Sequence, residues 1–146
     1  GYNFTYQEHA LHKNWFSAFK SIVITGISVL VLMSPLKKLV KPFLPKPGEG
    51  PSEEVQENGW FDCKYIVETE DGQKSVFNMS AKGDPGYRVT SKLVSECALC
   101  LIEDIDSLPG GDGYGGVLTS ASGLGDVLIN RLRNAGISFK GPILKD

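Results

Sequence analysis

The sequence predicts an α+β protein in which an apolar, membrane-type helix precedes a small ββ-α-(β)-α-β layer. Residues 15–36 form an apolar run whose single charged side chain is that of Lys20. Residues 60–68 alternate between apolar and polar side chains and lead into Asp71-Gly72, a pair typical of hairpin turns. Two later segments carry apolar residues at helical spacing, which together with the hairpin predicts a mixed layer of helices and strands.

Length and composition limit the class of protein. The 146 residues suffice for one folded domain with a modest core, and the formal net charge of −2 gives no electrostatic reason to expect nucleic acid as a partner. Three cysteines do not predict a disulfide framework and fit reduced thiols inside the cell. We divide the chain into an N-terminal arm (1–14), a membrane-associated or transmembrane helix (15–41), a proline-rich linker (42–58) and a C-terminal subdomain (59–146).

The apolar segment is open to three interpretations. Counted from Trp15, with Lys20 reaching toward the lipid headgroups, it attains the roughly 20 residues that span a bilayer. It could instead form a hydrophobic hairpin or interfacial helix, or a buried helix of a soluble core. We favour a spanning or deeply inserted helix, because the segment lacks the polar face of a surface helix. Membrane lipid is then an expected partner.

The charges around this segment predict its orientation. Four lysines follow it, against two before it (Lys37, Lys38, Lys41 and Lys46, against Lys13 and Lys20). The positive-inside rule therefore places the C-terminal subdomain on the cytoplasmic, matrix or stromal side of an intracellular membrane, such as the mitochondrial inner membrane or another organellar membrane. Four prolines then predict a stiff, non-helical linker, after which Ser52 can cap a short helical turn (Pro42, Pro45, Pro47 and Pro51).

Residues 60–68 and 74–81 are the predicted strands of a hairpin. Apolar residues share one face of each strand (Phe61, Cys63, Tyr65 and Val67; Phe77, Met79 and Ala81). Residues 83–86 form a predicted turn, in which Pro85 presets the backbone φ and Gly86 takes a positive φ if the turn is of type II.

Two helices and a last strand complete the predicted layer. Thr90 or Ser91 can cap the first helix, whose expected buried stripe is Leu93, Val94, Cys97, Leu101 and Ile105. Residues 117–119 form a short strand or an extended entry to the second helix. That helix can be capped by Ser120 or Ser122, and its expected stripe is Leu124, Val127, Leu128 and Leu132. Ala135-Gly136 ends it, and residues 137–139 form the last strand.

Three short motifs are better explained by structure than by chemistry. Residues 111–116 match G-x-G-x-x-G, but no strand precedes them and no helix opens from them, so we expect a flexible connection. Cys97 and Cys100 have C-x-x-C spacing on the apolar side of a helix, which favours two core cysteines over a redox pair or a zinc site. His9 and His12 could share a helix face, but no third metal ligand is near. We therefore assign no catalytic, cofactor-binding or metal-binding residue.

Asp84, Tyr87 and Thr90 are the candidates for lining a cleft. Together with Arg88 and Ser91 they lie where a turn opens into a helix, and free N–H groups at such a terminus attract anionic groups. The alternative is that these residues serve only the turn and the helix cap. Both interpretations stay open.

Several spaced motifs resemble one protein family. KGDPGYRVTSKLVSECALCLIED, at 82–104, and GGVLTSASGLGDVLINRLRNAGISF, at 115–139, resemble the C-terminal end of saccharopine dehydrogenase-like oxidoreductases. In that family a GDPGY-type turn is followed by T-x-K-x-L/M-x-x-E-x-A-L-x-L and later by G-G-V-x-T-P-A. GEGPSEEVQENGWF, at 48–61, also fits the family's GPS-x-E…W/F pattern. The resemblance extends over residues 16–139, and Ser120 stands where the family often has proline.

The resemblance implies a fold and leaves the activity of this chain open. Family members begin with a Rossmann domain that holds NAD(P), and the residues before Trp15 contain no such unit. We therefore expect no cofactor in this chain, and NAD(P) only if a separate Rossmann half exists.

Two functions follow as hypotheses. The first is a non-catalytic, membrane-anchored accessory or assembly subunit, whose partners are other protein subunits of a larger membrane complex, such as an organellar electron-transfer complex. The alternative is the C-terminal part of a split or longer NAD(P)-dependent reductase acting on a lipid-like substrate. We favour the first, because the residues supply no nucleotide-binding unit.

Overall fold

The computed structural model describes residues 4–44, 46, 48–111 and 113–145, and for residues 144 and 145 only the backbone. Pro45 and Pro47 of the predicted linker and Asp112 of the G-x-G-x-x-G motif lie outside the described residues. The chain divides into two compact units, Gly1–Glu49 and Gly50–Asp146.

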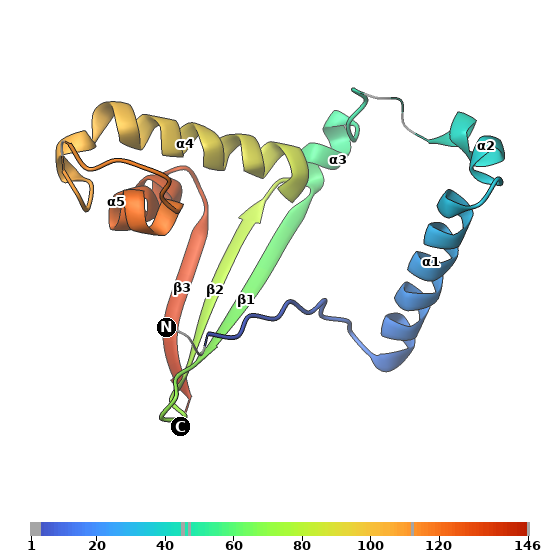
Figure 1. The fold of residues 1–146 in the computed structure, drawn as a ribbon, viewed down its shortest axis with the longest axis horizontal. Helices are drawn as coiled ribbons and strands as arrows, with labels where there is room; N and C mark the ends of the chain where they lie inside the picture. Colours follow the sequence, from blue (N-terminus) through green and yellow to red (C-terminus); the bar gives the residue numbers. More distant parts are fainter. Residues whose placement is uncertain (1–3, 45, 47, 112, 146) are drawn as a thin grey trace. The chain divides into compact units, whose positions relative to one another are not determined.

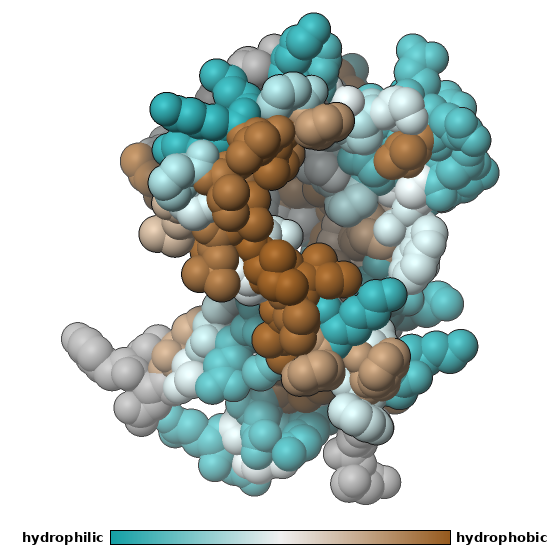
Figure 2. Space-filling view, turned by 90° about the vertical axis from the view of Figure 1, so that its right-hand side faces the viewer, coloured by the Kyte–Doolittle hydropathy of each residue, from teal (hydrophilic) through white to brown (hydrophobic). Residues whose placement is uncertain are grey.

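The first unit is built on the apolar helix α1 (Trp15–Met33). Asn14 caps it, since its side-chain oxygen accepts the N–H of Ser17 at 2.8 Å. By length and composition α1 can cross a membrane, although a signal sequence near an N-terminus meets the same criteria. None of its residues is buried within the described chain, and its side chains form a continuous hydrophobic band in Figure 2.

Two short helical turns follow α1. They are α2 (Lys37–Val40) and the 3-10 turn η1 (Lys41–Phe43), which contains Pro42 as one of its first residues. The expectation that the linker is non-helical from residue 42 is therefore wrong at its start. Proline fits here because the first residues of a helix need no N–H donor.

The second unit contains a three-stranded antiparallel sheet in the order β1 (Trp60–Glu68), β2 (Lys74–Lys82) and β3 (Ser138–Lys145). The sheet and its helices confirm the predicted α+β class. The hairpin forms as expected, with Tyr65 opposite Phe77 and a positive φ at Gly72. Before it, α3 (Glu53–Asn58) is capped by Ser52 as predicted and continues past the expected turn.

Strand β3 is longer than the predicted residues 137–139. Gly141 and Pro142 suggest a strand end in the sequence, but the structure uses them at an irregularity in the pairing opposite Val76 to Asn78. A side chain at Gly141 would come within 2.6 Å of the Val76 carbonyl oxygen, so the close approach of the two strands requires glycine there.

The entry to the first helix differs from the prediction. Pro85–Val89 forms one turn of π-helix, η2, which continues directly into α4 (Thr90–Glu103). The cap is Asp84, not Thr90 or Ser91, because its carboxylate accepts the N–H of Tyr87. Gly86 lies within this helical turn, and the positive φ of the segment is at Gly83. The turn is therefore not of type II, the case in which Gly86 would take a positive φ.

Of the two alternatives for residues 117–119, no strand forms, and the segment is the entry to α5 (Ser120–Asn134), with Thr119 in an extended conformation. Thr119 caps α5 in place of the expected Ser120 or Ser122, and Ser122 reciprocates by accepting the Thr119 N–H at 3.1 Å. The backbone of α5 departs from helical geometry at Gly125. The helix ends at Ala135-Gly136 as predicted, and the Ile137 N–H donates to the Leu132 carbonyl. Between α4 and α5 lies the short 3-10 turn η3 (Ile105–Ser107).

The core lies where α4 and α5 pack on one end of the sheet. Its buried residues are Val89, Cys100, Leu124, Leu128, Leu132 and Ile137, and the sheet contributes Phe61, Met79, Ala81 and Phe139. Figure 1 shows α4 running across this end, while the hairpin end of the strands extends away from both helices. The helices therefore cover part of the sheet.

The predicted stripe is confirmed for α5 and partly wrong for α4. Leu124, Leu128 and Leu132 are buried as expected. On α4, however, Leu93 and Cys97 contact the core and Cys100 is fully buried, whereas Val94 and Leu101 are exposed. Ile105 is exposed too and lies beyond the end of α4, in η3. The helix is apolar over a wider arc than α5 covers, so the sequence pattern alone cannot select the buried edge.

A cluster of salt bridges around Arg131, called the polar clamp below, joins α4 and α5 beside this core. The Arg131 guanidinium of α5 lies 2.9 Å from the carboxylate of Glu96, 2.9 Å from that of Glu103 and 2.8 Å from that of Asp104. These three acceptors hold the Arg131 pKa above its ordinary value. Lys92 adds a second bridge by donating from Nζ to the Ala135 carbonyl at 2.7 Å, at the C-terminus of α5.

We predict that Leu128→Ala lowers the free energy of unfolding by about 2–5 kcal/mol, because it opens a cavity between α5 and the sheet. Ile102→Ala on α4 is the control, since Ile102 is exposed and should cost far less. Urea unfolding followed by circular dichroism measures both. Equal losses in the two variants would contradict this location of the core.

Candidate functional site

The Asp84 turn is the first candidate, and its hydrogen bonds organise the start of α4. Asp84 is 8% exposed, and its Oδ2 accepts the Tyr87 N–H at 2.7 Å. Its carbonyl accepts the N–H of Val89 at 3.0 Å. Its other carboxylate oxygen, Oδ1, is buried and has no hydrogen-bond partner among the described residues. The carboxylate therefore caps the helix with one oxygen and leaves a buried acceptor at the other.

The same turn packs against the segment that contains α3. The Asp84 N–H donates to the Gln56 carbonyl at 2.9 Å, and the Gly83 N–H donates to the Gly59 carbonyl at 2.6 Å. A Cβ on Gly59 would lie 2.6 Å from the Asp84 nitrogen, and one on Gly50 would touch the Tyr87 ring at 3.3 Å. The segments that carry the motifs at 48–61 and 82–104 thus contact each other. The sequence does not predict this contact, because no pattern within either motif identifies its partner.

The three predicted cleft residues differ in burial. Asp84 is buried, whereas Tyr87 and Thr90 are exposed. The Thr90 hydroxyl donates to the Pro85 carbonyl at 2.6 Å, and Ser91 donates to that of Arg88. The described hydrogen bonds of Asp84 and Thr90 thus serve the turn and the cap, which is the alternative interpretation of these residues.

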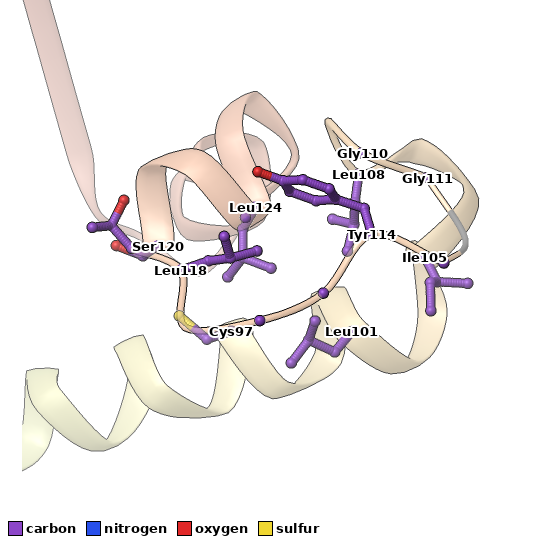
Figure 3. A pocket seen from close by; sticks show the side chains of 15 residues that line it. Cys97, Leu101, Ile105, Leu108, Gly110, Gly111, Tyr114, Leu118, Ser120 and Leu124 are labelled. Carbon is purple, nitrogen blue, oxygen red and sulfur yellow. The ribbon is translucent and has the colours of Figure 1, made fainter.

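A second candidate is a hollow of about 390 Å³ between α4, α5 and the glycine-rich segment that joins them. Cys97, Leu101 and Ile105 line it from the side of α4, and Leu118 and Leu124 line it from the side of α5 (Figure 3). The backbone of the glycine-rich segment and the ring of Tyr114 complete the lining. The run of glycines is the sequence signal for this hollow, and by itself it predicts only a flexible connection.

The described residues do not fit a nicotinamide nucleotide. The glycine-rich segment follows a helical turn rather than a strand, and no charged side chain is among the described residues that line the hollow. A dinucleotide site needs a strand, a glycine turn and a helix N-terminus in direct succession. No step of a reaction can be assigned to a nucleotide bound by this part of the chain.

The two α4 cysteines have the environment of core thiols. Cys100 is fully buried and Cys97 is half-buried, whereas Cys63 on β1 is exposed. Burial raises the pKa of both α4 thiols above their ordinary value, although the nearby Arg131 charge opposes the rise at Cys100. Since the thiolate is the reactive form, neither thiol is activated as a nucleophile.

Within the described ranges, no cluster of three or more His, Cys, Asp or Glu side chains could hold a metal ion. His9 is exposed and makes a local contact of 3.3 Å with the side chain of Gln7. The structure does not place a further ligand beside the two histidines.

Comparison with known proteins identifies homologues among mycobacterial reductases. A Mycobacterium tuberculosis protein provisionally named a trans-acting enoyl reductase is 42% identical over 102 residues, which are 70% of this chain and 24% of that protein. A trans-acting enoyl reductase of Mycobacterium bovis is 35% identical over 101 residues, 69% of this chain and 23% of its own length. One of Mycobacterium ulcerans is 36% identical over 93 residues, 64% of this chain and 21% of its own length.

The chain thus spans about a quarter of the length of these relatives. It is homologous to their C-terminal quarter. No family model matches the chain. No solved structure matches it either.

We predict that Gly59→Ala lowers the free energy of unfolding by about 1–3 kcal/mol, because the added methyl group would displace the Asp84 turn. Gly115→Ala is the matched control: a Cβ there meets nothing within 4 Å, so its effect should stay below about 1 kcal/mol. Thermal unfolding compares the two variants. A Gly59→Ala protein as stable as the control would show that the turn does not depend on this close approach.

We also predict that maleimide modifies Cys63 at least about tenfold faster than Cys100 in the folded protein, because Cys100 needs local unfolding and has a raised pKa. Peptide mapping by mass spectrometry gives the rate for each thiol. The difference should vanish in denaturant. Comparable rates without denaturant would mean that α4 is not packed as described.

Proposed function

We propose that this chain is the C-terminal part of an NAD(P)-dependent reductase of the saccharopine dehydrogenase-like class that acts on an α,β-unsaturated, lipid-like acyl substrate. The observation that carries the proposal is the 42% identity over 102 residues to the C-terminal quarter of a mycobacterial relative with an enoyl reductase name. The motifs at 82–104 and 115–139, and residues 50–61 of the motif at 48–61, which resemble this family, lie within the folded second unit. The homology favours this function over an accessory subunit.

In the proposed enzyme the nucleotide is held outside these residues, on a preceding segment of a longer protein or on a separate chain. Enoyl reduction adds a hydride and a proton across a carbon–carbon double bond, and NAD(P)H would supply the hydride. The second unit would contribute a packing surface and contacts to the substrate.

An exposed apolar strip on the sheet supports the need for such a partner surface. Tyr65 and Phe77 are paired across β1 and β2, on the face that carries Phe61 and Met79 into the core. Beyond the helices this face continues as Cys63, Tyr65, Val67 and Phe77, all of them exposed. Large exposed apolar surfaces mark contact sites in soluble domains. The strip is therefore suited to pack against the remainder of the reductase.

We further propose that α1 anchors this part of the enzyme in a membrane, with the folded second unit on the side of the lysines that follow it. Support comes from the apolar composition of α1 and from Lys37, Lys38 and Lys41 beside its end. A membrane location suits a reductase whose substrate is lipid-like. An accessory subunit of a membrane complex would use the same anchor, so the anchor does not distinguish the two functions.

The test is purification of the assembly from its native membrane, through a tag on this chain, followed by native mass spectrometry and an assay of NAD(P)H oxidation. We expect a nucleotide-binding segment, in the same or a partner chain, and oxidation that requires a long-chain enoyl thioester. The saturated thioester of equal length is the control substrate. Partners drawn only from another membrane complex, without enoyl-dependent oxidation, would reject the reductase and support an accessory subunit.

A further inference from the structure

Part of the apolar wall of the hollow between α4 and α5 is not buried in the core. Leu101 is 56% exposed, Ile105 42% and Leu118 40%, although all three line it. Cys97 and Leu101 lie one turn apart on the same face of α4, about 6 Å along its axis, and both line the hollow. Ile105, in the 3-10 turn η3 that follows α4, lines the hollow as well and extends the row beyond the end of the helix.

The opposite side of the hollow is mostly backbone. Five of the seven residues at 110–116 are glycines, and the segment carries one large side chain, Tyr114. A Cβ on Gly110 would come within 2.0 Å of the Tyr114 ring, so the ring lies directly against the Gly110 backbone. In Figure 3 the Tyr114 hydroxyl points toward α5, while the ring lies along the hollow.

The polarity of the lining selects the kind of ligand. The described lining contains no charged residue, and its polar side chains are few: Thr119 and Ser120 at the start of α5, Tyr114 and the Cys97 thiol. The Thr119 hydroxyl already contacts that of Ser122 in the cap of α5. A phosphate or carboxylate would find no compensating charge here, whereas an apolar chain would lose no hydrogen bonds.

We propose that this hollow binds the alkyl portion of a long acyl chain, laid along Cys97, Leu101 and Ile105 and covered by Tyr114. The row fits a linear chain better than a compact ring, and an unbranched alkyl group matches a lining whose described residues carry no charge. The identification of the ligand as an acyl chain rests on the proposed function, while the hollow and its apolar row do not. The second unit would then bind the tail of the substrate, remote from the nucleotide.

The test is photolabelling of the full chain in lipid nanodiscs, without NAD(P)H, by a long-chain acyl pantetheine with a diazirine near the end of the alkyl chain. Peptide mapping by mass spectrometry locates the label. We expect label within residues 97–124, competed by unlabelled long-chain thioester and not by acetyl thioester. Leu101→Asp should reduce this label about tenfold, because a carboxylate would interrupt the row.

The neighbouring Ile102→Asp is the matched control, since Ile102 is exposed on the same helix and does not line the hollow. It should leave the label within about twofold of the parent value. Leu118→Asp against Val117→Asp forms a second pair, because Val117 does not line the hollow either. Slow maleimide modification of Cys100 verifies that each variant is folded, and label on α1 provides the internal reference for probe in the lipid.

Label confined to α1, or an equal loss in each variant and its control, would overturn the acyl site. So would label at 97–124 that acetyl thioester competes as well, because the hollow would then select the thioester rather than the alkyl chain. The assay contains no nucleotide and measures no reduction. If the expected labelling is found but enoyl-dependent oxidation is not, the chain is an acyl-binding unit and not part of an enoyl reductase. If the oxidation is found but the labelling is not, the chain is part of a reductase that binds the tail of its substrate elsewhere.

Discussion

The packing of α4 against α5 over one end of the sheet is the contact on which the second unit depends. Cys100 is fully buried at its centre, where a small, weakly polar side chain allows two helices and a sheet to meet closely. Beside it Arg131 links α5 to three carboxylates around the C-terminal half of α4. Removing the arginine would leave those carboxylates close together without a countercharge. Apolar burial therefore sets the distance between the helices, and the clamp sets how they align.

This contact also determines what remains uncovered. Because the helices cover one end of the sheet, its core-facing side continues as exposed apolar residues such as Tyr65 and Phe77 toward the hairpin. Because α5 packs against the side of α4 that carries Leu93, Cys97 and Cys100, Leu101 stays exposed and borders the hollow. Cys97 and Ile105 of η3 border it as well. Both surfaces have the chemistry of contact sites, one broad and flat and the other narrow and elongated. A unit homologous to a quarter of a longer reductase would need the exposed strip on the sheet to pack against the rest of that protein. The hollow would then remain for a ligand.

The Asp84 turn connects the fold to the motifs that make the sequence resemble a family. Its backbone bonds to Gln56 and Gly59 join the segment before the sheet to the start of α4, and its carboxylate sets the first turn of that helix. A buried carboxylate oxygen without a described partner is costly unless a donor reaches it. The turn has a structural role that accounts for its sequence, so its place in the motif is not evidence of catalysis by Asp84, Tyr87 or Thr90.

The sequence by itself determined the elements whose signals are local. The apolar run of α1, the alternation in β1, the Asp71-Gly72 turn, the leucines of α5 and its Ala135-Gly136 end each follow from periodicity or backbone preference within a few residues. Only the tertiary structure decided the features that need two distant segments. These are the buried edge of α4, the extension of β3 past Gly141, the choice of Asp84 as the cap, and the hollow beside Tyr114. Each depends on which surface a partner element covers, and spacing along one segment does not contain that information.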